Sequence, residues 1–311
     1  MKPSPYTVRY SPQEVDHHYR TGLWSTETFH DILTRRVEET PDKVFATDGT
    51  RSFTFRELFD AGQRLAVGLH RRGLRRGDTA AVQLPNWVEF IQVLAALSRL
   101  GVVMVPIMPI YRREDVGYVL SNAGVRAVFT PAHFSKFGYL DMYLGLRQDH
   151  PELTIIVARP DSTANDVADA DADVFTLDQL EVDTDDDTAR AELGAAPSPD
   201  DPFVVVYTSG TTSRSKGCVH TFNTYCSGSR ALIEPFGYTE TDVQFGVTRH
   251  LIGDYIRHTE ACARAADVKP PWYSLEHTFV MESGAARLPK PPISGKAQGE
   301  RPAIPHLEAA E

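Results

Sequence analysis

Cysteine is scarce in this chain of 311 residues: there are three, and none forms a C-x-x-C pair. So few thiols exclude a disulfide framework, and we expect a reducing, cytoplasmic compartment. Ser98 and Arg99 interrupt the longest apolar stretch, residues 90–110, so no membrane-spanning helix is expected. The first ten residues lack the apolar core of a secretory signal. The 11 histidines are scattered without zinc-ligand spacing, and we expect no metal site.

The chain has fewer basic than acidic residues, and one segment accounts for the difference. The formal net charge is -10, and residues 161–201 hold 14 acidic residues against a single arginine, which leaves +3 for the remainder. Because the acidity is confined in this way, we expect no nucleic-acid partner. The favoured interpretation of the segment is a solvated connecting region. A metal site at Asp183, Asp185, Asp186 and Asp187 is the alternative, but the run lacks the glycine and closing glutamate of a calcium loop.

Helix and strand signals alternate from residue 52 to residue 158. Thr54 and Glu57 form a capping box, in which each side chain bonds the backbone N–H of the other, and an apolar helical pattern follows. Asn86 and Glu89 form a second cap pattern in front of a longer apolar helix. These two patterns predict where the helices of this region begin.

Short β-branched or buried runs separate the helices. We expect strands at 79–84, 102–106, 125–130 and 153–158, and a third helix at 114–122. A β-α-β-α-β order predicts a mostly parallel sheet flanked by helices, which is the α/β fold class.

The composition divides the chain into four parts. We expect a first α/β subdomain at 1–160, an acidic surface segment or linker at 161–202, and the start of a second α/β subdomain at 203–253. The last part, 254–311, loses apolar periodicity and contains seven prolines, so a divergent and poorly ordered tail is expected.

A loop rich in glycine and hydroxyl side chains follows the buried strand expected at 203–207. Its sequence from Tyr207 to Gly217 is Y-T-S-G-T-T-S-R-S-K-G, and we expect a helix to begin near Val219. Small residues allow backbone amides to converge on anionic oxygens, and a lysine adds a charge that can follow a phosphate. The loop therefore has the chemistry of a polyphosphate cradle at the edge of a sheet.

Two other interpretations of this loop fit less well. A Walker P-loop, G-x-x-x-x-G-K-[ST], requires glycine where Ser215 stands and Ser or Thr where Gly217 stands. A plain surface loop is the second alternative, since Ser, Thr and Gly cluster in such loops. The order T-S-G-T-T followed by Lys-Gly is more specific than a surface loop requires.

The loop resembles the signature [YF]-T-S-G-T-T-G-x-P-K-G of the adenylate-forming superfamily, which includes acyl-CoA synthetases, aryl-AMP ligases, luciferases and peptide-synthetase adenylation domains. Ser213 and Ser215 depart from it, replacing a Gly and a Pro. Residues 52–78 resemble the family's opening T-Y-x-E-L segment, and the A-V-Q-L-P-N run at 81–86 its L-P-N strand end. The resemblance covers roughly residues 15–253, and the N-terminal part looks most like aryl-AMP ligases and cyclohexanecarboxylate-CoA ligases.

The resemblance implies the large N-terminal domain of an enzyme that joins a carboxylic acid to ATP, releases pyrophosphate and passes the acyl group to coenzyme A. It implies ATP, Mg²⁺ and coenzyme A as cofactors and cosubstrates. The implied ATP phosphate contacts are Thr208, Ser209, Gly210, Thr211, Thr212 and Lys216. His250, in an H-L-I-G run, resembles a segment that lines the family's acyl pocket; an ordinary histidine near a loop is the alternative. No residue is assigned a catalytic role.

Other family motifs are absent from this sequence. There is no Y-G-x-T-E segment and no T-G-D segment with its usual context, and the run at 289–296 matches the family's P-K-T-x-S-G-K only imperfectly, with one residue too many. Two functions therefore stay open: an acid–CoA ligase represented by an incomplete chain, or a catalytically inactive fragment that is at most a nucleotide-binding or interaction module. The acid, and the choice between coenzyme A and a carrier protein, are not specified by the sequence.

Overall fold

The main sheet is built from short strands, most of them buried. The computed structural model describes residues 10–207, 214–231, 233, 237–239 and 242. The strands of this sheet are β3 (Thr79–Val82), β4 (Val103–Pro106), β5 (Ala127–Pro131), β8 (Thr154–Ala158), β9 (Val174–Thr176), β10 (Pro202–Tyr207) and β11 (Gly217–Thr221). Within the described residues the order across the sheet is β11-β10-β4-β3-β5-β8-β9.

Every neighbouring pair in this sheet is parallel except β10 and β11, which are antiparallel. The central strand β3 lies between β4 and β5, as expected when each strand is followed by a crossover helix. The predicted α/β class with a mostly parallel sheet is therefore confirmed.

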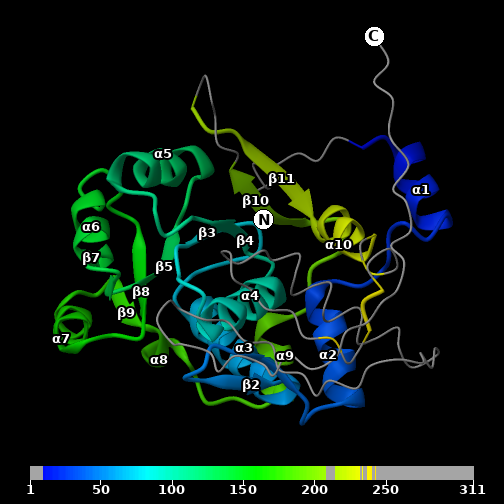
Figure 1. The fold of residues 1–311 in the computed structure, drawn as a ribbon, viewed down its shortest axis with the longest axis horizontal. Helices are drawn as coiled ribbons and strands as arrows, with labels where there is room; N and C mark the ends of the chain where they lie inside the picture. Colours follow the sequence, from blue (N-terminus) through cyan, green and yellow to red (C-terminus); the bar gives the residue numbers. More distant parts are fainter. Residues whose placement is uncertain (1–9, 208–213, 232, 234–236, 240–241, 243–311) are drawn as a thin grey trace, which may run out of the picture.

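Helices cover both faces of the sheet. Ala80 and Val82 of β3 belong to one apolar cluster, and Ala81 belongs to the other, because successive side chains of a strand point to opposite faces. The first cluster includes α3 (Phe55–Arg71) and α4 (Val88–Leu100); the second includes α5 (Arg113–Ala123), α6 (Tyr139–Leu146) and α7 (Ser162–Ala170). Figure 1 shows α6 on one side of β5 and β8, with α3 and α4 on the other.

Smaller elements surround this core. The N-terminal helices are α1 (Pro12–Arg20) and α2 (Phe29–Glu39), and α2 packs against α3 and α4. Two hairpins stand apart from the main sheet, and they are β1 (Val44–Thr47) with β2 (Ser52–Thr54), and β6 (His133–Phe134) with β7 (Phe137–Gly138). Among the described residues, no helix is both long and apolar enough to span a bilayer.

One predicted helix start is confirmed and one is wrong. The capping box of Thr54 and Glu57 begins α3 as expected. The N-cap of α4 is Trp87, and no side-chain cap is made there. Glu89 instead lies fully buried and pairs with Arg159 at 2.8 Å, while Asp48, distant in sequence, accepts a hydrogen bond from the Val88 N–H at 3.2 Å. Tertiary neighbours thus replace the local cap.

The acidic segment was expected to be a surface segment or linker; most of its side chains are exposed or half-buried, but it also supplies elements of the main fold. Besides α7 and β9 it contains α8 (Leu177–Leu180) and α9 (Asp186–Leu193), and β9 extends the main sheet by pairing with β8. Val174, Leu177 and Leu180 are buried and belong to the apolar clusters of the core, although their sequence neighbours are acidic. The sheet also runs across the predicted subdomain boundaries, since β10 pairs with β4. The predicted tail, 254–311, lies outside the described residues.

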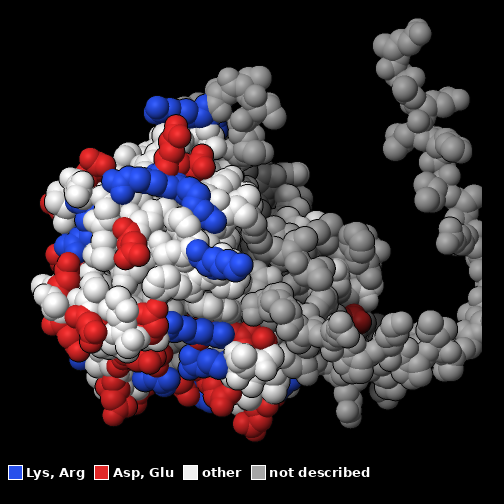
Figure 2. All heavy atoms as spheres, turned by 60° about the vertical axis from the view of Figure 1, so that its left-hand side comes forward, with Lys and Arg blue, Asp and Glu red and all other residues white. Residues whose placement is uncertain are grey.

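Arginines from the rest of the chain pair with six of the 14 acidic side chains of this segment. The ion pairs are Arg56–Asp186, Arg64–Glu181, Arg71–Glu192, Arg76–Asp201, Arg147–Asp171 and Arg147–Asp173. Figure 2 accordingly shows the two signs of charge interspersed over the face turned forward, with no separate acidic area.

Candidate functional site

The loop singled out by the sequence is the turn of a β-hairpin. Strand β10 ends at Tyr207 and β11 begins at Gly217, and these two residues are paired across the ladder. The helix expected near Val219 is therefore wrong: Val219 pairs with Val205 in β11, and α10 (Phe222–Arg230) begins only after Thr221, which caps it. The antiparallel pairing holds these residues extended, so the helix starts later.

The predicted phosphate contacts are only partly covered by the structure. Residues 208–212, five of the six predicted contacts, lie outside the described residues, and so does His250. Lys216 is described: its side chain is exposed, and it directly precedes β11. The structure thus places the two ends of the loop and Lys216, while the remaining contacts stay predictions.

The loop between β10 and β11 leaves the sheet at the carboxyl ends of the parallel strands, which is the edge where ligands of α/β sheets bind. Strand β10 runs parallel to β4, with Val204 opposite Met104, so the loop after β10 and the segment after β4 leave the sheet at the same edge. The buried Gln83 side chain holds the latter segment, because its amide group donates to the carbonyl oxygens of Met108 (3.0 Å) and Tyr111 (3.2 Å). Tyr143 donates in turn to the Gln83 side-chain oxygen at 2.7 Å.

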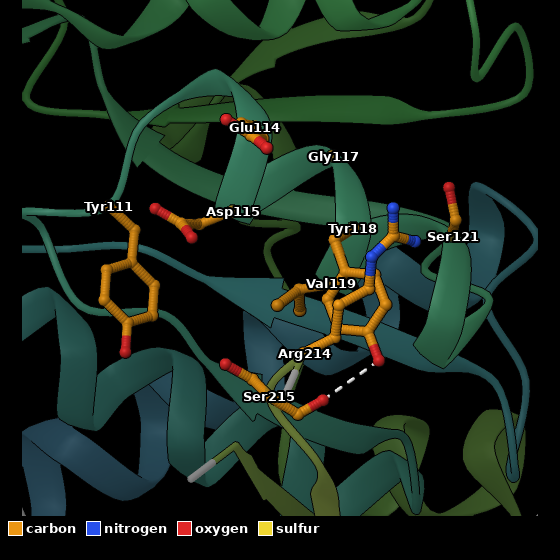
Figure 3. A pocket seen from close by; sticks show the side chains of 9 residues that line it. All are labelled: Tyr111, Glu114, Asp115, Gly117, Tyr118, Val119, Ser121, Arg214 and Ser215. Atoms are coloured by element: carbon orange, nitrogen blue, oxygen red, sulfur yellow. Dashed lines mark hydrogen bonds between the residues drawn. The ribbon is translucent and has the colours of Figure 1, made fainter. Parts of the chain in front are cut away.

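A cavity of about 410 Å³ lies between this hairpin and α5 (Figure 3). It is lined by Tyr111, Glu114, Asp115, Gly117, Tyr118, Val119, Ser121, Arg214 and Ser215. The Tyr118 hydroxyl donates to the carbonyl oxygen of Ser215 at 2.9 Å, drawn as the dashed line in Figure 3. The guanidinium of Arg214 lies 5.3 Å from the centre of the Tyr118 ring, within the range of a cation–π contact.

The other end of the loop contacts the same helix. The Tyr207 hydroxyl donates to the side-chain oxygen of Asn122 at 2.6 Å, and the rings of Tyr207 and Tyr118 meet edge to face with centroids 6.4 Å apart. Gly217 permits this arrangement, because a Cβ there would lie 2.8 Å from Val205 and 3.2 Å from the Tyr207 ring. A larger residue at 217 would require the Val205 and Tyr207 side chains to shift.

Two further side chains of β11 lie near the loop. Burial lowers the pKa of His220, on β11, whose ring meets that of Tyr225 edge to face at 5.4 Å. Cys218 of the same strand is exposed and carries a free thiol. No group of three or more His, Cys, Asp or Glu side chains that could hold a metal ion occurs in the part of the chain that the structure describes.

The sequence identified the loop but not the residues that fix its ends. Tyr118 and Asn122 come from a helix about 90 positions earlier, and nothing in the linear order connects them with the loop. The available signal was their spacing: residues four apart lie on one face of a helix, and these two carry polar groups. The partner of that face could not be known before the sheet was assembled.

The comparisons with known proteins agree with this geometry. The family model described as AMP-binding enzyme matches residues 33–249, which include the whole hairpin. The chain is 28% identical over 238 residues to a medium-chain fatty-acid–CoA ligase of Escherichia coli K12, covering 76% of this chain and 40% of that protein. It is 36% identical over 149 residues to a 2,3-dihydroxybenzoate-AMP ligase of Bacillus subtilis, covering 47% and 28% respectively.

Among solved structures, the apo structure of Mycobacterium smegmatis MbtA is similar in fold, with a TM-score of 0.66 and 23% identity. That match covers 76% of this chain and 42% of the other. The chain spans about two fifths or less of the length of these relatives, and what it shares with them is their N-terminal portion.

Proposed function

Because the chain belongs to the AMP-binding enzyme family, we propose that it serves in the ATP-dependent activation of a carboxylic acid. In this reaction the carboxylate attacks the α-phosphorus of ATP, which gives an acyl-adenylate and pyrophosphate. The acyl group then passes to a thiol, for which we propose coenzyme A. The work of the protein in such a step is positioning and charge stabilisation.

The observation that carries the proposal is the place of the loop. A turn rich in Gly, Ser and Thr, with Lys216 at its end, joins β10 to β11 at the carboxyl edge of the parallel sheet and lies within the matched residues. Convergent amides, hydroxyl groups and a lysine are the donors that a polyphosphate requires. We propose that Thr208, Ser209, Gly210, Thr211, Thr212 and Lys216 bind the β- and γ-phosphates of ATP.

Mg²⁺ enters this proposal with ATP. The ion binds proteins chiefly through one or two carboxylates together with substrate phosphates, so the nucleotide supplies part of its coordination. We further propose that His250 lines the acyl pocket, that the chain acts in the cytoplasm and that it has no nucleic-acid partner. The last two rest on the thiol count and the charge distribution.

The nature of the acid is bounded only by the relatives. One is named for medium-chain fatty acids and another for 2,3-dihydroxybenzoate, so chain-like and aryl acids both belong in a substrate screen. The resemblance of the N-terminal part to aryl-AMP and cyclohexanecarboxylate-CoA ligases adds alicyclic acids to that screen and agrees with the aryl class.

A second candidate function follows from the motifs that these 311 residues lack. Without the Y-G-x-T-E and T-G-D segments, the contacts to adenine, ribose and Mg²⁺ that the family uses are missing. We propose that the 311-residue chain by itself binds ATP weakly through the loop and does not complete the ligase reaction. Loss of a single preorganised contact costs about 10²–10³ in rate, and several lost together bring turnover close to background.

One experiment tests the loop and separates the two functions. ATP binding and ATP–pyrophosphate exchange are measured on the 311-residue chain with aryl, alicyclic and fatty acids, beside Lys216→Ala and the control Lys136→Ala. Lys136 is exposed like Lys216 and lies in the turn between β6 and β7. A charge-assisted hydrogen bond contributes about 1.5–3 kcal/mol, so Lys216→Ala should weaken ATP binding by about ten- to a hundredfold.

Each outcome decides between the candidates. Equal ATP affinity in wild type and Lys216→Ala, or no ATP binding by wild type, rejects the loop as the phosphate site. Exchange clearly above the Lys216→Ala background rejects the inactive fragment and supports the complete activation step.

A further inference from the structure

We propose that α5 fixes both ends of the phosphate loop, and that Tyr118 and Asn122 are positioning residues for the binding of ATP phosphates. The proposal rests on the function proposed above and adds to it two residues from a distant part of the chain. They act through Ser215 and Tyr207, without touching the phosphates themselves.

The first contact holds the end of the loop that leads into β11. The Tyr118 hydroxyl bonds the backbone carbonyl of Ser215, the residue immediately before Lys216. A bond to the backbone restrains the peptide unit that precedes the lysine, whatever the side chain at 215. The cation–π contact between Arg214 and the Tyr118 ring restrains the neighbouring residue as well. Figure 3 shows the Arg214 side chain along the Tyr118 ring and Ser215 next to the Tyr118 hydroxyl group.

The second contact holds the opposite end of the loop. Tyr207, the last residue of β10, donates its hydroxyl proton to the Asn122 side chain at 2.6 Å. Tyr118 and Asn122 are four residues apart on α5, which places them on one face of the helix. A single helix face therefore contacts the chain on both sides of the loop.

Helix α5 is well suited to serve as this support. Its opposite face is buried in the core through Val116, Val119, Leu120 and Ala123. Its carboxyl end is fixed by Gly124 in the left-handed conformation (φ 60°), and the Arg113 side chain at its start donates to the carbonyl oxygen of Gly145 on α6 at 3.0 Å. The polar face therefore projects from a fixed element, and contacts made with it transmit that position to the loop.

The functional consequence is preorganisation. Amides and a lysine that converge on a polyphosphate bind more tightly when the loop does not have to be ordered at the moment of binding. Removal of one hydrogen bond at a loop end should release part of this restraint. We expect Tyr118→Phe and Asn122→Ala each to weaken binding of ATP and of inorganic triphosphate by about two- to tenfold.

A proteolysis experiment tests the restraint without any nucleotide. Trypsin cleaves after Arg214 and Lys216, so the cleavage rate at these two bonds, followed by mass spectrometry on the full chain, reports the freedom of the loop end. We expect both variants to be cut several times faster there, with cleavage elsewhere and the thermal unfolding midpoint unchanged. Asn122→Asp, which keeps the acceptor oxygen, should restore the wild-type rate.

The matched control is Tyr111→Phe. Tyr111 lines the same cavity and is half-buried like Tyr118, and its hydroxyl makes no hydrogen bond among the residues that the structure describes. This variant should be cut at the wild-type rate.

The two readouts fail independently. Unchanged cleavage after Arg214 and Lys216 in both variants, or equal acceleration in Tyr111→Phe, overturns the positioning role. Faster cleavage without any triphosphate or ATP binding by wild type keeps the restraint but removes the proposed phosphate site. Faster cleavage with unchanged affinity shows that α5 holds the loop ends without serving binding, which also overturns the inference.

Discussion

The acidic segment and the two ends of the loop between β10 and β11 contact the rest of the molecule in different ways. The acidic segment, which has the composition of a solvated linker, adds β9 to the edge of the sheet and packs α8 directly against the backbone of α3. The ends of the loop, at Tyr207 and at 214–215, contact α5 through two hydrogen bonds, one cation–π contact and one edge-to-face ring contact. Close packing supplies stability, whereas a few directional bonds supply position.

This difference predicts where substitutions affect the whole fold and where they act locally. The effects should be largest where backbones touch in the interior, smaller where a buried group titrates, and smallest where charges pair near the surface.

The largest effect is expected for Gly68→Ala in α3. An added Cβ would overlap the carbonyl oxygen of Leu180 in α8, and this backbone contact cannot be relieved by rotating a side chain. Overpacking of this kind typically costs about 1–3 kcal/mol and occasionally more, and we expect the upper end of that range. Urea unfolding of the purified variants measures the difference.

The control for Gly68→Ala is a glycine of α10, the helix that follows β11. Gly228 lies inside α10, and a Cβ there would have no neighbour within 4 Å. Gly228→Ala should therefore stabilise the protein by about 0.5–1 kcal/mol through helix propensity. Equal effects of the two substitutions would show that α8 does not pack tightly against α3.

A smaller effect is expected from the titration of His30. Burial lowers the pKa of His30 to about 4, and the nearby charge of Arg99 acts in the same direction. The unfolded chain takes up this proton near pH 6.5, whereas the folded protein does so only near pH 4. Stability should therefore fall as the pH is lowered through this window, by roughly 3 kcal/mol between pH 7 and pH 4.

The His30→Gln variant isolates this contribution. The free energy of unfolding, measured between pH 7 and pH 4, should fall less steeply in the variant than in wild type. Identical slopes would mean that the ring, which stacks on Phe59 with centroids 5.6 Å apart, is protonated equally in the folded and unfolded chains.

The smallest effect is expected for the ion pairs of the acidic segment. Arg147 pairs with Asp171 at 2.6 Å and Asp173 at 3.0 Å, and all three side chains retain contact with solvent. A double-mutant cycle with Arg147→Met and Asp171→Asn should give a coupling below about 1 kcal/mol that decreases with added salt. A coupling well above that value would mean that charge pairing, and not packing, holds the acidic segment in place.

Much of the local structure could be predicted from sequence. The capping box at Thr54, the parallel strands and the loop between Tyr207 and Gly217 all follow from short-range spacing and residue type. The failures involve partners that are distant in sequence: Glu89 forms ion pairs where a cap was expected, and Val219 joins a strand where a helix was expected.

The sequence by itself determined two local patterns. One is the alternation of helix and strand that builds an α/β sheet, and the other is a loop whose glycine, hydroxyl and lysine residues are of the types that suit a polyphosphate. Tertiary structure alone decided that an acidic run supplies the edge strand β9, and that α5 meets both ends of the loop through Tyr118 and Asn122. The physical reason is the distance along the chain over which each interaction acts. Periodicity and capping act over a few residues and can be read along the chain, whereas strand pairing and side-chain contacts depend on which surfaces the assembled sheet brings together.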